Sequence, residues 1–403
     1  MMSFNPPEHV GYILHHLAEN GHAAYLVGGC VRDAVMGRHV HDWDIATSAA
    51  PVDVATLFPK TVMTGEKFGT VTVISADDTV EVTTFRVESG YKDSRRPERV
   101  TFVENLNEDL RRRDFTMNAM AISVARRLID PYGGIKDIKS RVIRCVGDPD
   151  ARFLEDALRM FRAFRFSAAL GFNIEEGTMR AICANAGKAK LISAERVRVE
   201  LEKTLLSHRP EIAGEMIKAG LLAKYVSESE ISPDGLVKIE RLPAEPVMRW
   251  CAFCAILLEE HLITSAMDFL QGMQLDGKTV KTCACALSIP EFPSDRTDIK
   301  RVFSKHGVQT TRCAAAINDT RQGSSSIAPI IGSDEPYPCL ARVNEIMASG
   351  ECFSLSKLAV SGGDLIALGH PPGQELGEML NMLLGYVLGH PEDNKREVLL
   401  KMV

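Results

Sequence analysis

Two aspartates, Asp42 and Asp44 in the segment 42–47 (DWDIAT), are the residues best suited to chemistry in this chain. On an extended strand, residues two apart point to the same face, so both carboxylates would share one side of a sheet. Carboxylate oxygens are ligands that Mg²⁺ prefers. Two such ions about 3.5–4 Å apart would activate an attacking hydroxyl and neutralise a leaving pyrophosphate. The pair predicts phosphoryl or nucleotidyl transfer, with Asp42 and Asp44 as catalytic metal ligands.

A third carboxylate, Glu81, lies on a neighbouring predicted strand at 80–85. It alternates with Val80 and Val82, so it points to the face opposite theirs. There it could assist the metals or the nucleophile as a further catalytic group. The alternative is that all three acids are solvated residues on exposed strand faces, because short Asp-x-Asp patterns are common.

A glycine turn precedes the acids. Gly28 and Gly29 end a predicted strand at 24–28. Glycine permits positive φ and lets backbone N–H groups approach an anion closely. Arg32, one helical turn later, can supply a forked donor to a triphosphate. Alone, this pattern also fits a plain strand-to-helix turn with a surface arginine. Together with the acids downstream, it favours a phosphate-binding loop.

The segment 112–119 (RRDFTMNA) combines basic, acidic and amide groups at the entry to a predicted strand. Arg113 could bind the nucleotide phosphates or sugar, Asp114 could orient Arg113, and Asn118 could fix the loop or the sugar. The alternative is a solvated charge run, which is the usual role of such clusters. Solvated runs do not usually lead into apolar sequence of this kind.

A predicted helix at 152–171 places Asp156 and Arg159 next to each other on its polar face. Adenine and cytosine share one edge pattern, an amino donor beside a ring-nitrogen acceptor, and guanine and uracil present the opposite pattern. An acceptor next to a donor therefore selects A and C together. Arg162 and Arg165 would serve phosphate or stacking roles. The alternative is an ordinary salt-bridged helix surface.

These residues lie on a chain whose character changes near residue 148. Before it, the patterns predict a helix at 8–19, a mobile polar loop at 86–103, and strands at 24–28, 44–47, 71–74, 80–85, 119–124 and 128–130. After it, helical periodicity takes over, with helices at 152–171, 175–186, 193–206, 210–219 and 374–388 and a loop at 323–338. The predicted fold is an α+β head followed by an all-α region.

Composition limits the remaining possibilities. The 403 residues are enough for two or more domains, and a net charge of −6 excludes a surface that binds nucleic acid everywhere. RNA contacts must come from local basic patches such as 111–113 or 95–99. No apolar run reaches transmembrane length, and the N-terminus lacks a secretory signal. We therefore expect a cytoplasmic protein without membrane contact, whose ten cysteines are reduced and mostly buried rather than zinc ligands.

With these motifs in order, the sequence resembles the class II tRNA nucleotidyltransferases, the CCA-adding enzymes of the tRNA nucleotidyltransferase/poly(A) polymerase family. The matching segments are 26–33 (LVGGCVRD), 42–47, 112–119, 130–134 (DPYGG), 155–159 (EDALR) and 195–200 (ERVRVE). The resemblance implies a polymerase-β-like nucleotidyltransferase head at 1–148. An elongated helical neck with a nucleotide-selecting helix at 149–208, an RNA-binding body at 209–290 and a tail at 291–403 would follow.

The resemblance also implies an activity, template-independent addition of C, C and A to tRNA 3′ ends from CTP and ATP. Asp42 and Asp44 would hold Mg²⁺, and the tail would grip the tRNA elbow. The incoming nucleotide would be bound by residues of all three motif clusters, namely Gly29, Arg32, Arg113, Asp156, Arg159, Arg162 and Arg165. The oligomeric state is left open by the sequence.

Related activities remain as alternatives. Bacterial poly(A) polymerases share the catalytic motifs, but their signature after the neck helices and their basic C-terminal extension are absent here. CC-adding enzymes lose the loop that this chain retains at 86–97, which favours addition of the final A, and an A-adding enzyme stays open. From a different class, a non-catalytic RNA-binding protein on an inactive head is disfavoured by the intact carboxylates and arginines.

Overall fold

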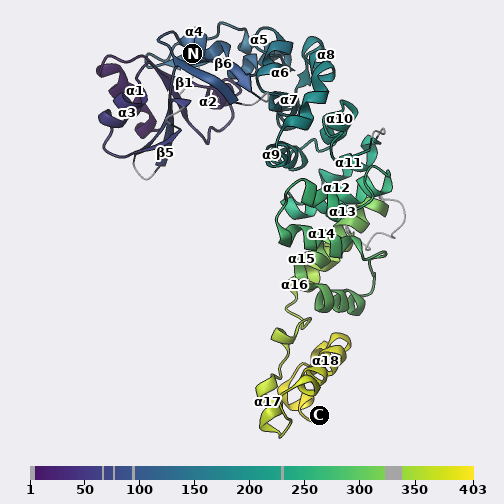
Figure 1. Ribbon diagram of the computed structural model, residues 1–403. Coiled ribbons are helices and arrows are strands. Elements are labelled where there is room, and N and C mark those ends of the chain that lie inside the picture. Colours follow the sequence, from purple (N-terminus) through teal and green to yellow (C-terminus); the bar gives the residue numbers. More distant parts are fainter. Residues whose placement is uncertain (1–4, 66–67, 76–77, 93–95, 228–230, 323–337) are drawn as a thin grey trace. The chain divides into compact units, whose positions relative to one another are not determined.

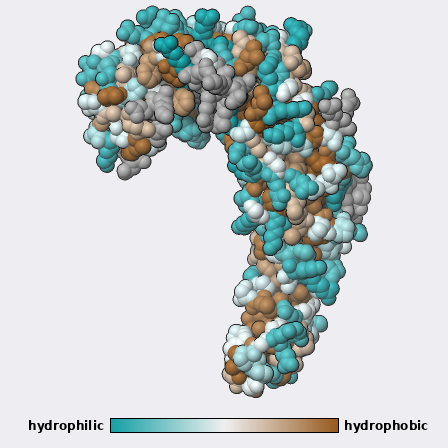
Figure 2. All heavy atoms as spheres, viewed as in Figure 1, coloured by the Kyte–Doolittle hydropathy of each residue, from teal (hydrophilic) through white to brown (hydrophobic). Residues whose placement is uncertain are grey.

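The structure is a computed structural model, and it describes residues 5–65, 68–75, 78–92, 96–227, 231–322 and 338–403. The chain divides into two compact units (Figure 1). The first contains residues 1–201 and 215–224, and the second contains residues 202–214 and 225–403. On the face shown in Figure 2, hydrophilic side chains cover much of each unit, and apolar side chains are scattered among them.

The first unit is built on a mixed sheet of seven strands in the order β3-β4-β5-β2-β1-β8-β9. Strands β2 and β5 pair in parallel, and the other neighbours in this sheet pair antiparallel. The strands are β1 (Ala24–Val27), β2 (Asp44–Thr47), β3 (Thr61–Gly65), β4 (Thr70–Ser75), β5 (Asp78–Thr84), β8 (Ala121–Ser123) and β9 (Leu128–Ile129). The predicted strands of the head are confirmed to within a few residues.

Helices complete this unit. They are α1 (Glu8–Glu19), α2 (Gly29–Val35), α3 (Pro51–Leu57), α4 (Leu106–Arg111), α5 (Gly134–Ser140), α6 (Pro149–Glu155), α7 (Leu158–Leu170) and α8 (Glu176–Asn185). Helices α9 (Ala194–Leu205) and α10 (Ile212–Lys218) each have residues in both units. Helix α1 buries Val10, Ile13, Leu14 and Leu17, the i, i+3, i+4, i+7 spacing of one helical face. Two short strands, β10 (Val142–Ile143) and β11 (Asn173–Ile174), pair in parallel.

A cluster of buried apolar residues lies on the sheet face that also carries Asp44. It includes Val27, Ala46, Phe85 and Ala121, and all of these are nearly or fully buried. Ala46 follows Asp44 by two residues on β2, so both point to the same face. The apolar cluster thus anchors the part of the sheet from which the carboxylate projects.

The prediction of a mobile polar loop at 86–103 is wrong. Strands β6 (Arg86–Lys92) and β7 (Arg96–Phe102) form an antiparallel hairpin, with Arg86 opposite Phe102 and Glu88 opposite Val100. The hydropathy pattern did not indicate these strands because charged, ion-paired residues occupy the side of β6 that is half-buried. Arg86 and Glu88 alternate along β6 and bond to each other at 2.7 Å, so the half-buried side of the strand is charged rather than apolar. The centre of the predicted loop, residues 93–95, lies outside the described residues, and with it Arg95 of the basic patch at 95–99.

The prediction of a single helix at 152–171 is also wrong. The chain forms two helices, α6 and α7, which are separated at Asp156, where φ of −144° and ψ of 103° are extended. The Asp156 carboxylate accepts a hydrogen bond from the backbone N–H of Leu158 at 3.0 Å. An aspartate offers the backbone this alternative to continuous helix, as at helix N-termini. Leu154, an apolar residue of α6 just before the break, is exposed.

The second unit is helical. Its helices are α11 (Pro233–Ile239), α12 (Pro246–Glu259), α13 (Ala266–Gly272), α14 (Gly277–Leu287), α15 (Arg296–Gln322), α16 (Pro338–Ala348), α17 (Gly362–Ala367), α18 (Gln374–Gly389) and α19 (Arg396–Leu399). Helix α12 is buried on nearly every side and packs against α14 and α15. Gly307, with φ of 79°, kinks α15. The predicted loop at 323–338 lies outside the described residues except for Pro338, where α16 begins.

All ten cysteines are free thiols, and eight are buried, including Cys251, Cys254, Cys283 and Cys313 of the second unit. Burial raises the pKa of the Cys254 thiol well above its usual value, so it stays protonated and unreactive. Cys183 is exposed and Cys285 is partly buried, so the expectation that the cysteines are mostly buried holds with these two exceptions. In the described part of the chain, no helix is both long and apolar enough to cross a membrane.

Candidate active site

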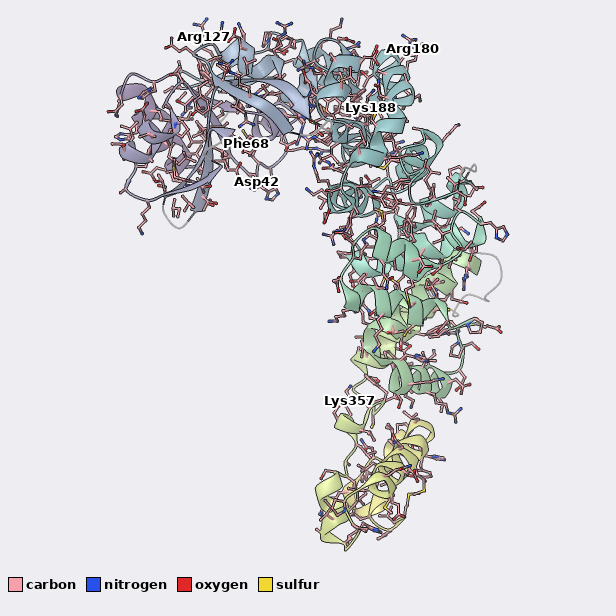
Figure 3. The ribbon with its side chains drawn as sticks, in the orientation of Figure 1. Asp42, Phe68, Arg127, Arg180, Lys188 and Lys357 are labelled. Atoms are coloured by element: carbon pink, nitrogen blue, oxygen red, sulfur yellow. The ribbon has the colours of Figure 1, made fainter. Side chains whose placement is uncertain are left out.

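Three carboxylates gather at the start of β2. Asp44 is the first residue of this strand, and its register partner on the parallel strand β5 is Glu81, so both side chains point to one face. Asp42 precedes the strand and lies at the surface of the first unit (Figure 3). Burial raises the pKa of Asp44; Arg113 lowers it, and the negative charges of Glu81 and Asp42 raise it further. The three acids are therefore close enough to repel one another.

This donor set fits a divalent cation. The acids supply hard oxygen ligands, and their mutual repulsion is relieved by positive charge between them. In the described residues, no three His, Cys, Asp or Glu side chains form a ready-made metal cluster. Such an ion would therefore be held by one or two carboxylates, with substrate phosphates completing its coordination, as is usual for Mg²⁺.

The predicted glycine turn lies directly against the acids. Gly28 precedes α2 with φ of 76°, a conformation that favours glycine. A Cβ atom at this position would lie 3.0 Å from Nη1 of Arg113 and 3.5 Å from Oδ2 of Asp44. Gly28 thus satisfies a backbone requirement and also leaves room for the arginine beside the carboxylate.

A cavity of about 370 Å³ opens beside Asp44 and collects the other predicted residues. It is lined by all of the predicted nucleotide-binding residues except Arg165, namely Gly28, Gly29, Arg32, Arg113, Asp114, Asn118, Asp156, Arg159 and Arg162, together with Asp44, Arg112, Leu158, Phe166 and Arg196. Five separate segments of the chain contribute to it. Its size is within the usual range for small-molecule sites.

Aromatic stacking groups three of the arginines. The guanidinium carbons of Arg32, Arg162 and Arg165 lie 5.2, 5.3 and 3.9 Å from the ring centroid of Phe166. Such cation–π contacts hold guanidinium groups in place without consuming their N–H donors. Arg165 itself pairs with Glu200 at 2.6 Å and does not line the cavity.

Asp114 does not orient Arg113 as the sequence suggested. It accepts from Nη2 of Arg162 at 2.6 Å and from the Asn118 amide at 3.0 Å. Burial raises the pKa of Asp114, but Arg162 and Asn118 outweigh it and hold that pKa well below its usual value. The aspartate stays ionised and keeps Arg162 and Asn118 at the cavity wall.

The carboxylate that holds Arg113 is Asp109, which sequence reasoning missed. Asp109 is only 1% exposed and accepts from Arg113 Nη2 at 3.1 Å and from Arg112 Nη2 at 2.7 Å. Burial raises its pKa, and these two guanidinium groups lower it to below the usual value. The spacing i, i+3 and i+4 from Asp109 to the two arginines was a signal present in the sequence.

The predicted base-recognition pair is divided in the structure. Asp156 accepts from Nη2 of Arg196 at 2.8 Å. Arg159 instead donates to the Glu155 carboxylate at 2.7 Å and to the carbonyl oxygens of Arg112 and Arg152, at 2.7 and 3.2 Å. Arg196, which sequence reasoning left out of the site, is thus the direct neighbour of Asp156, although the segment 195–200 was already recognised as a motif.

Two buried N–H groups at the cavity have no hydrogen-bond partner in the structure, Nε of Arg113 and Nη1 of Arg196. A buried donor without an acceptor costs about 1–3 kcal/mol, so native structures leave one only for a reason. Both are arginine donors beside a cavity. The arrangement is suited to a ligand rich in acceptors, such as a nucleoside triphosphate.

Comparison with known proteins identifies the family. Residues 24–144 match the family "Poly A polymerase head domain", residues 171–229 match "Probable RNA and SrmB-binding site of polymerase A", and residues 248–403 match the second domain of tRNA nucleotidyltransferases. A CCA-adding enzyme of Geobacillus sp. is 39% identical, with 96% of this chain and 93% of that protein covered. The chain belongs to the family of CCA-adding enzymes.

Other members support this assignment. The CCA-adding enzyme of Bacillus velezensis is 44% identical over 69% of this chain and 70% of its own. The solved CCA-adding enzyme of Bacillus stearothermophilus in complex with CTP is 33% identical, with a TM-score of 0.79 and coverage of 99% of this chain and 98% of that one. The fold class predicted from the sequence is confirmed, and membership of this nucleotidyltransferase family implies dependence on a divalent metal.

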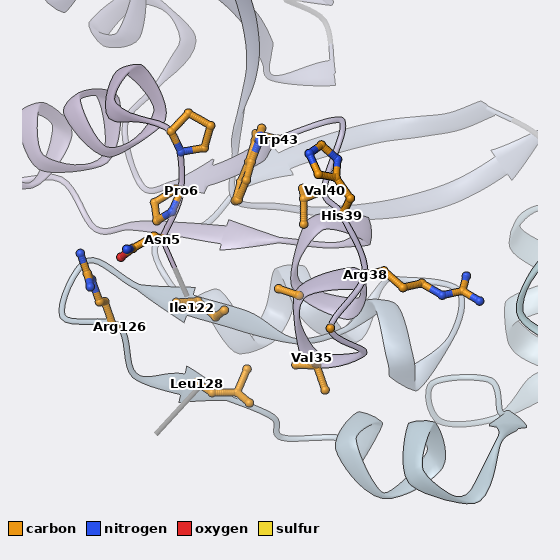
Figure 4. A pocket seen from close by; sticks show the side chains of 13 residues that line it. Asn5, Pro6, Val35, Arg38, His39, Val40, Trp43, Ile122, Arg126 and Leu128 are labelled. Carbon is orange, nitrogen blue, oxygen red and sulfur yellow. The ribbon is translucent and has the colours of Figure 1, made fainter. Parts of the chain in front are cut away.

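The first unit has a second and larger cavity, of about 760 Å³ (Figure 4). It is lined by the segment after α2, which includes Arg38, His39 and Trp43, by Ile122 and Leu128, and by Arg126 at its other end. None of the predicted site residues lines it. Its size alone does not identify a ligand.

Proposed function

We propose that this chain adds C, C and A to the 3′ end of tRNA, without a nucleic-acid template, using CTP and ATP and releasing pyrophosphate. One observation carries the proposal: carboxylates suited to a metal, phosphate-binding arginines and Asp156 line or adjoin a single cavity. The names of the relatives support it, since they are called CCA-adding enzymes. The CTP bound by the Bacillus stearothermophilus relative agrees with a nucleotide in this cavity.

The proposed metal is Mg²⁺, held by Asp42 and Asp44 with assistance from Glu81, and it would neutralise the phosphates and lower the pKa of the attacking 3′-hydroxyl. The chain's own side chains position the nucleotide. Arg32, Arg113 and Arg162 donate to the triphosphate, and the Gly28–Gly29 turn admits it closely. Charge that develops on the leaving pyrophosphate is stabilised by these fixed donors, which need no reorganisation during the reaction.

Base selection is proposed to rest on the acceptor Asp156 and the donor Arg159, both of which line the cavity. The Asp156 carboxylate would accept a hydrogen bond from the amino group that cytosine and adenine share. It would repel the carbonyl oxygen that guanine or uracil has at the same position. Arg159 donates to the carbonyl oxygen of Arg112 at the cavity, and Arg165 stacks on Phe166.

The rest of the chain is proposed to bind tRNA. The division into a head at 1–148, a neck at 149–208, a body at 209–290 and a tail at 291–403 stays a prediction, as does the grip of the tail on the tRNA elbow. We also propose a cytoplasmic location, where tRNA, CTP and ATP are present and free thiols such as those of this chain persist.

The testing experiment is a nucleotide-by-nucleotide extension assay. Three tRNAs that end before the first C, before the second C and before the final A are each incubated with CTP, with ATP, and with both. We expect growth to the complete CCA end and no further. A long ladder with ATP alone would instead identify a poly(A) polymerase, the second candidate that the head-domain match favours. Extension of only some of the three substrates would identify a CC- or A-adding enzyme.

A further inference from the structure

We infer that Asp33 is a positioning residue for the proposed reaction, because it fixes the Arg32 guanidinium in the orientation in which it donates to the triphosphate of the incoming nucleotide. The inference rests on the proposed function and deepens it by naming what holds one of the phosphate-binding arginines. Asp33 ends the segment 26–33 and is not among the predicted site residues.

Two parallel hydrogen bonds join Arg32 to Asp33. Nε of Arg32 donates to Oδ1 of Asp33 at 2.9 Å, and Nη2 donates to Oδ2 at 2.8 Å. Such a bidentate pair fixes the plane of the guanidinium as well as its position. Neighbours in sequence do not face each other on a helix, so α2 does not impose this contact. A free arginine side chain populates many rotamers, and the pair selects one of them.

The orientation leaves donors of Arg32 for a ligand. An arginine side chain has five N–H donors. Asp33 accepts from two of them, and Oδ1 of Asn118 accepts from Nη1 at 2.9 Å. One N–H therefore remains on each of Nη1 and Nη2. A Cβ atom on Gly29 would lie 3.7 Å from Nη2, so this end of the guanidinium lies beside the glycine turn, and both residues line the cavity. Two terminal N–H groups in this place are suited to oxygens of a phosphate chain.

Asp33 itself does not line the cavity, so it acts on a ligand through Arg32. Its negative charge has a second effect of opposite sign, because it repels a triphosphate at long range. The Asp33 side chain is 24% exposed, and solvent and salt screen this repulsion, whereas the Arg32 side chain is only 11% exposed. Hydrogen bonds weaken steeply when their geometry is lost. Loss of orientation should therefore outweigh the relief of repulsion when the charge is removed.

The test measures binding of CTP with Mg²⁺ by calorimetry, and incorporation of CTP into a truncated tRNA, for Asp33→Asn. We expect the Kd and the KM for CTP to rise about tenfold, with a smaller change in kcat. Glu176→Gln is the control, since it also removes one negative charge and an ion pair, with Arg180, outside the cavity. It should leave the Kd unchanged. Unchanged or tighter CTP binding by Asp33→Asn would overturn the inference.

A second comparison shows whether Asp33 acts through Arg32. When it is added to Arg32→Ala, Asp33→Asn should not weaken CTP binding further, because the group that it positions is gone. Losses that multiply would mean that Asp33 acts elsewhere, which overturns the inference. Should Asp33→Asn not fold, Asp33→Glu is compared in the same two backgrounds, and equal losses in both would count against the inference in the same way.

These outcomes are distinct from failure of the proposed function. If the unmodified protein binds CTP but does not extend tRNA, CCA addition is contradicted, and the calorimetric comparison of Asp33 and Arg32 variants still decides the inference. If Arg32→Ala alone leaves the Kd for CTP unchanged, the proposed phosphate contact of Arg32 fails, and the role of Asp33 fails with it.

Discussion

Arg249 of the second unit and two arginines of the first unit, Arg113 and Arg196, use buried guanidinium groups in opposite ways. Arg249 of the second unit is 4% exposed and donates to five backbone carbonyls, those of Leu205, Ser207, Glu240, Leu242 and Pro243. Arg113 and Arg196 of the first unit each contact a carboxylate but keep a buried N–H without an acceptor. The guanidinium donors of Arg249 are used by backbone carbonyls, whereas Arg113 and Arg196 each keep one donor without an acceptor beside a cavity.

The difference separates a structural from a ligand-binding use of charge. A guanidinium that satisfies several carbonyls ties together segments that would otherwise bury unpaired acceptors. A guanidinium with an unsatisfied donor costs stability, and that cost is recovered only when an acceptor-rich ligand binds. Substitutions in the two regions should therefore affect different measurements.

The largest effect is expected at the carboxylates. Asp42→Ala should reduce incorporation of both CTP and ATP by about 10³-fold or more, since it removes a ligand of the catalytic cation. Thermal unfolding should be unchanged, because Asp42 is exposed. Glu104→Ala, another exposed acid of the same unit, is the control and should retain activity. Substantial turnover by Asp42→Ala would contradict the metal role.

The structural arginine should affect stability instead. Arg249→Met is expected to lower the free energy of unfolding by about 3 kcal/mol or more, because several buried carbonyls lose their donor together. Urea denaturation followed by circular dichroism measures this, and CTP binding should persist at urea concentrations below the transition. Arg301→Met removes an arginine that is 64% exposed and should cost almost nothing. An equal, small cost for both would refute the distinction.

Asp109 provides an intermediate case, a buried acid that acts on the cavity through Arg112 and Arg113. Asp109→Asn should raise the KM for CTP and ATP alike, about tenfold, because Arg113 loses its orienting partner and no base contact changes. Asp109→Glu should recover part of the affinity, since it keeps the charge. A changed preference between CTP and ATP, with KM unaffected, would show that Asp109 does not position the phosphate-binding arginine.

The smallest effect is expected from a salt bridge of the second unit. Arg296 and Lys300 lower the pKa of Glu351 from its ordinary value of 4.5 to about 2. A lowered pKa in the folded state means that this contribution to stability is complete above pH 4.5 and is lost as the pH falls towards 2. The free energy of unfolding, measured by urea denaturation, should therefore change less between pH 4.5 and pH 3 in Glu351→Gln than in the unmodified protein. The difference should be less than about 1 kcal/mol. An unchanged dependence would contradict the assignment.

Most of the head could be predicted because its patterns are local. Helix α1 has one apolar face, strands β2 and β5 are bounded by polar segments, and Gly28 marks a turn. The hairpin β6–β7 could not be found in the same way. Its half-buried face carries Arg86 and Glu88, and their burial depends on partners contributed by α4 and the residues after it.

The amino-acid sequence by itself determined the chemistry, because the spacing of Asp42 and Asp44, the glycine turn and the clustered arginines depend only on residue type and local geometry. The tertiary structure alone decided which groups face each other. In the folded protein the helix is interrupted at Asp156, and this residue accepts a hydrogen bond from Arg196. Arg159 donates to the backbone carbonyl of Arg112, and Arg113 donates to Asp109. Such pairings join segments distant in the chain and are set by competition for buried hydrogen-bond partners, which no local pattern records.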